Sequence, residues 1–237
     1  NVMTAAAMQA RQSPSPRPSA DQVREILIVD DHPLMCDALA LTLKISFGLK
    51  NVRTARSLAA AIEQIKAQGA PDAVILDLNL PDARGSEGIV TLRRQLPDVP
   101  ITMISADLEH AMIAAAMAAG AQGYISKSLS REALVDSLRR MWGGEHVTPD
   151  SYHPGEPDAE DTARAELARR FSTLTPQQMK ILRLICQGKA NKEISYELSI
   201  AEATVKTHIT AIMSKINARR RTQAVLLANS VRLFEAG

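Results

Sequence analysis

The sequence predicts an α/β fold, a doubly wound five-stranded parallel sheet, followed by a small all-α domain of four helices. Three observations support this prediction. Between residues 25 and 142, short apolar β-like segments alternate five times with helical patterns, the order found in parallel sheets covered by helices on both faces. After residue 172 every periodic segment is helical, and the stretch between the two regions is rich in proline and acidic residues.

The domain limits follow from these patterns. We place the α/β domain at residues 24–143, an acidic linker at 144–171 and the helical domain at 172–237. The linker is expected to be a polar connector with a helical pattern after Asp161. Residues 1–23 are rich in Ala, Ser and Pro and lack the apolar core of a signal peptide, so we expect a disordered leader.

In the first domain, each predicted strand is followed by a predicted helix. Strands are expected near residues 25–30, 51–55, 73–77, 100–105 and 122–126, and helices near 33–46, 57–68, 86–96, 109–119 and 130–141. The first, third and fourth strands have no alternating polar face, which is typical of strands that are covered on both sides.

In the second domain, Thr175-Pro176-Gln177-Gln178 predicts a capping box that opens a helix ending near Gly188. Further helices are expected at 191–198, at about 202–216, and from about Arg221 onward. The second and third are joined by residues 199–201 alone, a turn of helix-turn-helix length.

The composition is that of a globular protein, with 46% hydrophobic and 23% charged residues. No apolar run approaches the roughly 18 residues that a membrane helix needs, so no membrane association is expected. Cys36 and Cys186 lie in separate helical patterns without a CxxC spacing, which favours two reduced thiols over a disulfide or metal site. We therefore expect a cytoplasmic protein.

The charge is unevenly distributed along the chain. Residues 24–143 hold 13 basic and 14 acidic residues, net −1, and residues 144–171 hold 3 and 7, net −4. Residues 172–237 hold 10 basic and 4 acidic residues, net +6. A small basic domain behind a near-neutral one favours a polyanionic partner for the C-terminal region.

Polar side chains follow four of the predicted strands. Asp30 and Asp31 follow the first, Asp77 ends the third, Ser105 ends the fourth and Lys127 follows the fifth. The carboxyl ends of parallel strands share one rim, where such folds bind ligands. Each residue alone has a structural explanation, such as a helix cap, a turn or a solvated lysine. Together they predict a site where Asp77 accepts a phosphoryl group beside Mg²⁺.

At these residues the chain resembles a response-regulator receiver domain, the flavodoxin-like module that sensor histidine kinases phosphorylate. The resemblance implies that Asp77 is the phosphoacceptor and that Asp30, Asp31, Asp77 and the backbone carbonyl of Asn79 hold Mg²⁺. It also implies that Lys127 and Ser105 bind the phosphoryl group. The Tyr124 ring is then expected to turn inward when Ser105 moves toward the phosphoryl group. The matching stretches are Val29–His32, Leu76–Pro81, Ile104–Ala106 and Gly123–Lys127.

The third helix of the second domain has two different faces. Its inward set is expected to be Val205, Ile209, Ile212, Met213 and Ile216. The opposite face carries Lys206, Thr207 and Thr210, with His208 on its flank, a combination suited to a helix in the major groove of double-stranded DNA. Lys192 and the basic cluster at 219–221 are expected to follow the phosphates.

The second domain resembles the LuxR-type DNA-binding domain, and with the receiver it gives the order of the NarL/FixJ family of response regulators. We expect a homodimer on DNA, for which the last helix offers Val225, Leu227 and Ala228 as a candidate surface, with packing of the same residues in the domain core as the alternative. The matching stretches are Leu174–Pro176, Gln187–Ile194, Ala203–His208, which includes Thr204, and Arg221–Val225.

The chain also departs from this family. Gln177-Gln178 stand where Arg-Glu is usual, Ala190 and Ala201 stand where serines usually cap helices, and Asn217 and Arg220 replace Gly and Asn. Each lost cap costs about 0.5–2 kcal/mol, so we predict a DNA-binding domain less stable than its relatives.

The expected function is that of a two-component response regulator in which phosphorylation of Asp77 by a histidine kinase controls DNA binding and transcription, and not that of an enzyme. One alternative is DNA binding that does not depend on phosphorylation. A haloacid-dehalogenase-type phosphatase would need a second Asp where Asn79 stands, and an RNA-binding antiterminator would lack this recognition helix.

Overall fold

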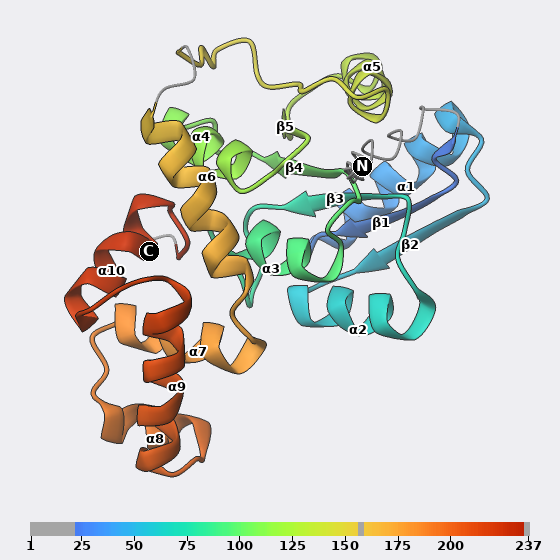
Figure 1. The fold of residues 1–237 in the computed structure, drawn as a ribbon. Helices are drawn as coiled ribbons and strands as arrows, with labels where there is room; N and C mark the ends of the chain where they lie inside the picture. Colours follow the sequence, from blue (N-terminus) through green and yellow to red (C-terminus); the bar gives the residue numbers. More distant parts are fainter. Residues whose placement is uncertain (1–21, 156–158, 235–237) are drawn as a thin grey trace, which may run out of the picture.

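The computed structural model describes residues 22–155 and 159–234, which form two domains joined by a long helix (Figure 1). The leader predicted for residues 1–23 lies outside the described residues except for its last two positions. Of these, Val23 is buried in the core of the first domain.

The first domain alternates strands and helices as the sequence predicts. In chain order the elements are β1 (Glu25–Val29), α1 (Pro33–Phe47), β2 (Asn51–Ala55), α2 (Leu58–Gln68), β3 (Ala73–Asp77), α3 (Glu87–Gln95), β4 (Ile101–Ser105), α4 (His110–Ala118), β5 (Gly123–Ser126) and α5 (Arg131–Trp142). The strands pair in the order β2-β1-β3-β4-β5, and all four pairings are parallel.

Helices cover both faces of this sheet, and an apolar cluster lies between the sheet and the helices on each face. On one face, Leu39 and Leu43 of α1 and Leu138 of α5 are buried with Ile28 and Ile75. On the other face, buried side chains of α2, α3 and α4 pack on the remaining inward residues of the strands. The doubly wound fold predicted from the sequence is therefore confirmed.

The strand register brings the predicted polar residues to one rim. Val29 pairs with Leu76, so Asp30 and Asp77 follow neighbouring positions. Asp77 pairs with Ile104, and Ser105 pairs with Ser126. Asp30, Asp77, Ser105 and Lys127 therefore leave the sheet at the same edge, because parallel strands end together there.

The second domain contains α7 (Pro176–Cys186), α8 (Asn191–Leu198), α9 (Glu202–Lys215) and α10 (Arg221–Ser230). The predicted capping box is present, with Thr175 and Gln178 exchanging side-chain to backbone hydrogen bonds. Ala190 and Ala201 precede α8 and α9 in extended conformation but have no side-chain oxygen to cap them. The predicted loss of two caps is therefore confirmed.

The helix predicted in the linker after Asp161 is confirmed and begins two residues earlier, at Ala159. It is α6 (Ala159–Ser172), whose Ala168 and Phe171 are buried, and this helix packs against α3 and α4 (Figure 1). The reason is the apolar side of α6, which the acidic composition of the linker obscures. Part of the predicted acidic run, residues 156–158, lies outside the described residues, and Glu160 and Asp161 pair with Arg164 on the same helix.

Both cysteines are free thiols, as predicted. Burial raises the pKa of the Cys36 thiol, and it raises the pKa of the Cys186 thiol to about 11, so both are protonated at neutral pH. Across residues 22–155 and 159–234, we find no helix with the length and hydropathy needed to cross a membrane.

Candidate functional site

The predicted acidic residues form a compact cluster at the rim of the sheet. Asp30, Asp31, His32 and Asp77 each offer one ligand atom, and these atoms all lie within 4.8 Å of one another. Asp30 and Asp77 are almost completely buried, whereas Asp31 is exposed. Asp30 and Asp77 therefore form the buried side of the cluster, and Asp31 lies on its solvent-exposed side.

Lys127 forms ion pairs with both buried carboxylates. Lys127 Nζ lies 3.1 Å from Asp77 Oδ2 and 3.5 Å from Asp30 Oδ2. Within the described structure, Lys127 is the closest charged partner of these two carboxylate oxygens. Three carboxylates around one lysine leave an excess of negative charge, which a buried site does not tolerate without a further cation.

The protonation of Asp77 reflects this excess. Burial raises the pKa of Asp77 above its ordinary value, and the nearby Asp30 carboxylate raises that pKa further. Lys127 and the backbone N–H of Asn79, which donates to Asp77 Oδ1 over 3.3 Å, favour the ionised form and only partly compensate. A bound divalent cation would supply the missing positive charge.

The donor set fits Mg²⁺. Hard oxygen ligands from one or two carboxylates, with room for water and a phosphoryl oxygen, are what this ion prefers. The buried carboxylates of Asp30 and Asp77, which share the cation Lys127, could supply such ligands.

Ser105 and Tyr124 meet at the loop after β4. Ser105 Oγ accepts a hydrogen bond from the backbone N–H of Asp107, and the Tyr124 hydroxyl donates to the carbonyl of Asp107 over 2.5 Å. Tyr124 is 1% exposed. Its ring is therefore already buried. The Tyr124 hydroxyl and Ser105 both form hydrogen bonds with the backbone of Asp107.

The linker takes part in this arrangement, which the sequence did not indicate. The backbone N–H of Tyr124 donates to the carbonyl of Val147, which forms a bridge beside the edge strand β5. Further along the linker, Tyr152 lies against His110 of α4, with ring centroids 4.6 Å apart. The beginning of the linker thus covers the α4–β5–α5 side next to Tyr124.

Sequence reasoning also overlooked His32. Its Nδ1 atom lies 2.9 Å from Asp30 Oδ1, 3.1 Å from Asp31 Oδ1 and 3.8 Å from Asp77 Oδ2. The signal was present, since His32 directly follows the acidic pair.

The predicted DNA-reading face of α9 points away from its own domain core. Thr204, Lys206, Thr207 and Thr210 are exposed, and His208 is half-buried. The expected inward side chains pack against the core, with Val205, Ile212 and Ile216 fully buried and Ile209 and Met213 partly so.

The two remaining predicted DNA contacts differ. Lys192 on α8 is exposed. Arg221 is half-buried, and its guanidinium donates to Asn191 Oδ1 over 2.6 Å and to the carbonyl of Lys189. These bonds tie the start of α10 to the start of α8, so Arg221 has a structural role that its charge did not reveal.

The apolar set suggested for the dimer surface of α10 belongs instead to the core. Ala228 is completely buried, and Val225 and Leu227 pack partly against the same core. The prediction is wrong for Ala228, because the side of α10 that bears it rests on α7. Leu226, at 68% exposure, is the large apolar side chain that α10 turns outward.

The two domains are joined by a polar interface at the start of α3, where the chain leaves the Asp77 loop. The backbone N–H groups of Ser86 and Glu87 donate to the carbonyls of Arg232 and Leu233, over 2.8 and 3.1 Å. Ser86 Oγ donates to the carbonyl of Val231 over 2.7 Å. The free N–H groups at the start of α3 are thus satisfied by the segment after α10.

Charged pairs surround these bonds. Glu87, which is 2% exposed, pairs with Arg183 of α7, and Glu109 pairs with Arg232 over 2.6 Å. Arg94 of α3 donates to the carbonyl of Leu174 over 2.6 Å. The sequence gave no signal for these contacts, because the partners lie up to 123 residues apart.

Comparison with known proteins agrees with both domains. Residues 26–139 match the response regulator receiver domain, and residues 172–228 match the bacterial regulatory proteins of the luxR family. The chain is 31% identical to the glycerol metabolism activator of Pseudomonas putida over 211 residues, covering 87% of this chain and 96% of that protein. It is 30% identical to the nitrate/nitrite response regulator NarL of Escherichia coli K12 over 209 residues, covering 88% and 96%.

Among solved structures, a DNA complex of the two-component response regulator RcsB matches with a TM-score of 0.51, at 21% identity, over 88% of this chain and 98% of that one. At this identity the likeness concerns the fold alone. The curated relatives, however, match over nearly their whole length and include both domains in the same order. The chain therefore belongs to the NarL/FixJ family of response regulators, with a receiver domain followed by a LuxR-type DNA-binding domain.

Proposed function

We propose that phosphorylation of Asp77 by a sensor histidine kinase controls the binding of this protein, as a homodimer, to specific double-stranded DNA and thereby controls transcription. The observation that carries the proposal is the buried pair of carboxylates, Asp30 and Asp77, that share Lys127 next to the exposed Asp31. We infer DNA binding as the regulated activity from the family, since its members are DNA-binding regulators.

The proposed chemistry is a phosphoryl transfer. An Asp77 oxygen attacks the phosphorus of the phosphohistidine, the P–N bond breaks and an acyl phosphate forms. Asp30, Asp31, Asp77 and the carbonyl of Asn79 would hold Mg²⁺, which supplies charge neutralisation for the phosphoryl oxygens. Lys127 and the Ser105 hydroxyl would bind the remaining phosphoryl oxygens. The later loss of the phosphoryl group to water is the only other reaction proposed.

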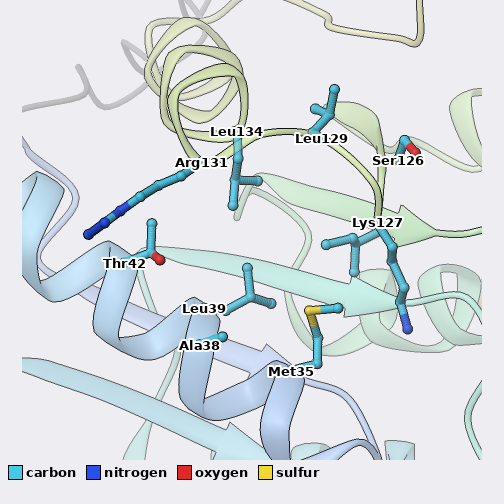
Figure 2. Close-up of a pocket in the computed structure, with 10 residues that line it drawn as sticks. Met35, Ala38, Leu39, Thr42, Ser126, Lys127, Leu129, Arg131 and Leu134 are labelled. Carbon is cyan, nitrogen blue, oxygen red and sulfur yellow. The ribbon is translucent and has the colours of Figure 1, made fainter.

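The kinase would approach over α1. Leu34, Leu41 and Ile45 form an exposed stripe on this helix, with 84%, 59% and 63% of their surfaces accessible. Beside it lies a cavity of about 190 Å³ between α1 and the start of α5 (Figure 2). Its lining is mostly apolar, and its polar side chains are those of Thr42, Ser126, Lys127 and Arg131. Because Lys127 borders both the cavity and Asp77, a helix docked here would carry its phosphohistidine to the phosphoacceptor.

The switch would act on the interface between the domains. Movement of Ser105 toward a phosphoryl group takes its Oγ away from the N–H of Asp107, and that loop leads directly to Glu109 and its partner Arg232. The loop after Asp77 leads likewise to Ser86 and Glu87. Both connections end on the segment after α10, so phosphorylation would loosen the DNA-binding domain from the receiver.

One observation favours the second candidate, DNA binding that does not depend on phosphorylation. The receiver does not cover the reading face of α9: Lys206, Thr207 and Thr210 stay exposed while the domains are docked. In the proposed function, the contact between the receiver and the DNA-binding domain therefore prevents two DNA-binding domains from binding adjacent half-sites together. A single DNA-binding domain can still contact DNA in this arrangement.

The experiment that separates the two functions is a selection of genomic DNA fragments on the full chain, with and without Mg²⁺ and a small-molecule phosphodonor. The Asp77→Asn variant is compared with Asp98→Asn, which changes an exposed aspartate away from the cluster. Fragments enriched only after phosphorylation, and lost in Asp77→Asn alone, support the proposed function. Equal enrichment in every condition supports phosphorylation-independent binding.

A further inference from the structure

The ring of His32 is held over the carboxylate cluster by its own backbone. The N–H of His32 donates to Asp30 Oδ1 over 2.9 Å, which makes a tight turn after the acidic pair. Pro33 follows, and a residue before proline is restricted to extended conformations, here φ −90° and ψ 106°. His32 precedes α1 without capping it through its side chain, so its imidazole is free to face the carboxylates.

Nδ1 makes a hydrogen bond with Asp30 Oδ1 in this structure, and the distances around Nδ1 also match those between neighbouring ligands of one cation. Ligands about 2.1 Å from an octahedral ion lie about 3.0 Å apart along each edge. Nδ1 lies 2.9 Å from Asp30 Oδ1 and 3.1 Å from Asp31 Oδ1. The carboxylates of Asp30, Asp31 and Asp77 outnumber Lys127, the lysine that pairs with the two buried ones, and this excess of negative charge independently indicates that the cluster holds a cation.

A nitrogen donor changes which cation such a site prefers. Mg²⁺ is bound through oxygen and keeps its waters, whereas imidazole is a good ligand for first-row transition ions. We propose that Nδ1 of His32 is a direct ligand of the divalent cation at Asp30, Asp31 and Asp77, and that it raises the preference of this receiver for transition ions such as Mn²⁺ over Mg²⁺.

The proposal rests on the proposed function, because it concerns the cation that serves phosphorylation of Asp77. As a ligand, Nδ1 would give up its hydrogen bond to Asp30 Oδ1 and its lone pair would take the position of a water ligand. The side chain of His32 is 64% exposed, so Nε2–H can remain hydrated. Lys127 pairs with the Oδ2 atoms of Asp30 and Asp77, so the cation would share these two carboxylates with the lysine.

The test uses the full chain loaded with Mn²⁺, whose electron spin senses nearby ¹⁴N nuclei in electron spin echo envelope modulation. His32→Asn keeps a polar group but removes the imidazole. His153→Asn, an exposed histidine of the linker, is the matched control. Calorimetric titrations with Mn²⁺ and with Mg²⁺ give the affinity ratio for each protein, and thermal melting verifies that each variant is folded.

Histidine ¹⁴N coupling is expected in the unchanged chain and in His153→Asn, and it should vanish in His32→Asn. The ratio of Mn²⁺ to Mg²⁺ affinity should fall by about tenfold or more in His32→Asn only. Mn²⁺ bound without nitrogen coupling, or an equal loss of affinity for both ions, overturns the role of His32 and leaves the proposed function intact. Failure of both ions to bind, with Asp30→Asn indistinguishable from the unchanged chain, overturns the cation site of the proposed function as well.

Discussion

Asp77 is a carboxylate at a buried position, where an ionised side chain is unfavourable. It ends β3, where Val74, Ile75 and Leu76 are fully buried, and it is itself 2% exposed. Asp30 lies beside it and competes for the same lysine. A buried charge that is only partly compensated opposes folding, and such groups are typical of functional sites.

This arrangement predicts that Asp77→Asn stabilises the receiver near neutral pH. The pKa of Asp77 is raised in the folded chain, so the folded state binds the proton more tightly than the unfolded state. Stability therefore decreases as pH rises from the ordinary carboxyl value of 3.8 through the higher folded pKa. Removing the charge should add about 1–3 kcal/mol above that window.

The measurement is thermal unfolding of both proteins between pH 3 and pH 8 without divalent ions. The advantage of Asp77→Asn should shrink toward zero below pH 3.8, where the carboxyl is protonated in both states. Saturating Mg²⁺ should stabilise the unchanged chain more than the variant. An advantage that is the same at every pH would contradict this account.

At the scale of elements, the helix-turn-helix unit lacks several local stabilising groups. Ala190 and Ala201 leave the first turns of α8 and α9 without side-chain caps. Ser199 and Asn217 adopt positive φ angles of 53° and 55°, a conformation that favours glycine. Asn217 stands where the family usually has glycine, and asparagine tolerates this conformation better than most residues.

A single cap should therefore stabilise the domain. Ala201 is exposed and has the extended conformation of an N-cap residue, with φ −65° and ψ 146°. Ala201→Ser should raise the free energy of unfolding by about 0.5–2 kcal/mol, because its hydroxyl can accept a hydrogen bond from the first turn of α9.

Urea denaturation of isolated residues 172–237 measures this effect. Ala203→Ser, at an exposed position inside the same turn, is the control and should change stability by less than about 0.5 kcal/mol. High stability of the unchanged domain would contradict the prediction that its missing caps leave it marginal.

At the scale of the whole molecule, one buried apolar cluster extends from the receiver through α6 into the DNA-binding domain. Leu92 of α3, Ile113 of α4, Phe171 of α6 and Ile181 of α7 all belong to it. Next to this cluster, Glu87 and Arg183 form an ion pair in which the carboxylate is almost fully buried. The two domains thus share both apolar and charged contacts.

Breaking that ion pair should separate the domains. Arg183→Met leaves the Glu87 carboxylate buried without a partner, which costs about 3–5 kcal/mol if the interface stays closed. Opening the interface rehydrates Glu87 and is the cheaper response. Small-angle X-ray scattering should therefore give a larger radius of gyration for Arg183→Met than for the unchanged chain.

Two comparisons make this result specific. Arg164→Met removes an arginine from exposed pairs within α6 and should leave the scattering unchanged. Adding Glu87→Gln to Arg183→Met removes the buried charge and should restore part of the compact population. If Arg183→Met scatters like the unchanged chain, the ion pair does not hold the domains together.

The sequence by itself determined the local features. Alternation of apolar segments and helical patterns placed the strands and most helices within about a residue or two of the observed bounds. The positions of Asp30, Asp77, Ser105 and Lys127 at strand ends were also readable, because all strands of a parallel sheet end at one rim. These features depend on neighbouring residues or on the repeating geometry of the fold.

Only the tertiary structure decided the contacts between distant segments. The pairing of Glu87 with Arg183 and the use of Arg221 to join α10 to α8 have no local signal. His32 was visible beside the acidic pair, but its distance to Asp77 follows from where β1 and β3 place them. A side chain's partner across the fold depends on how whole elements pack, and the periodicity of one segment contains no information on that packing.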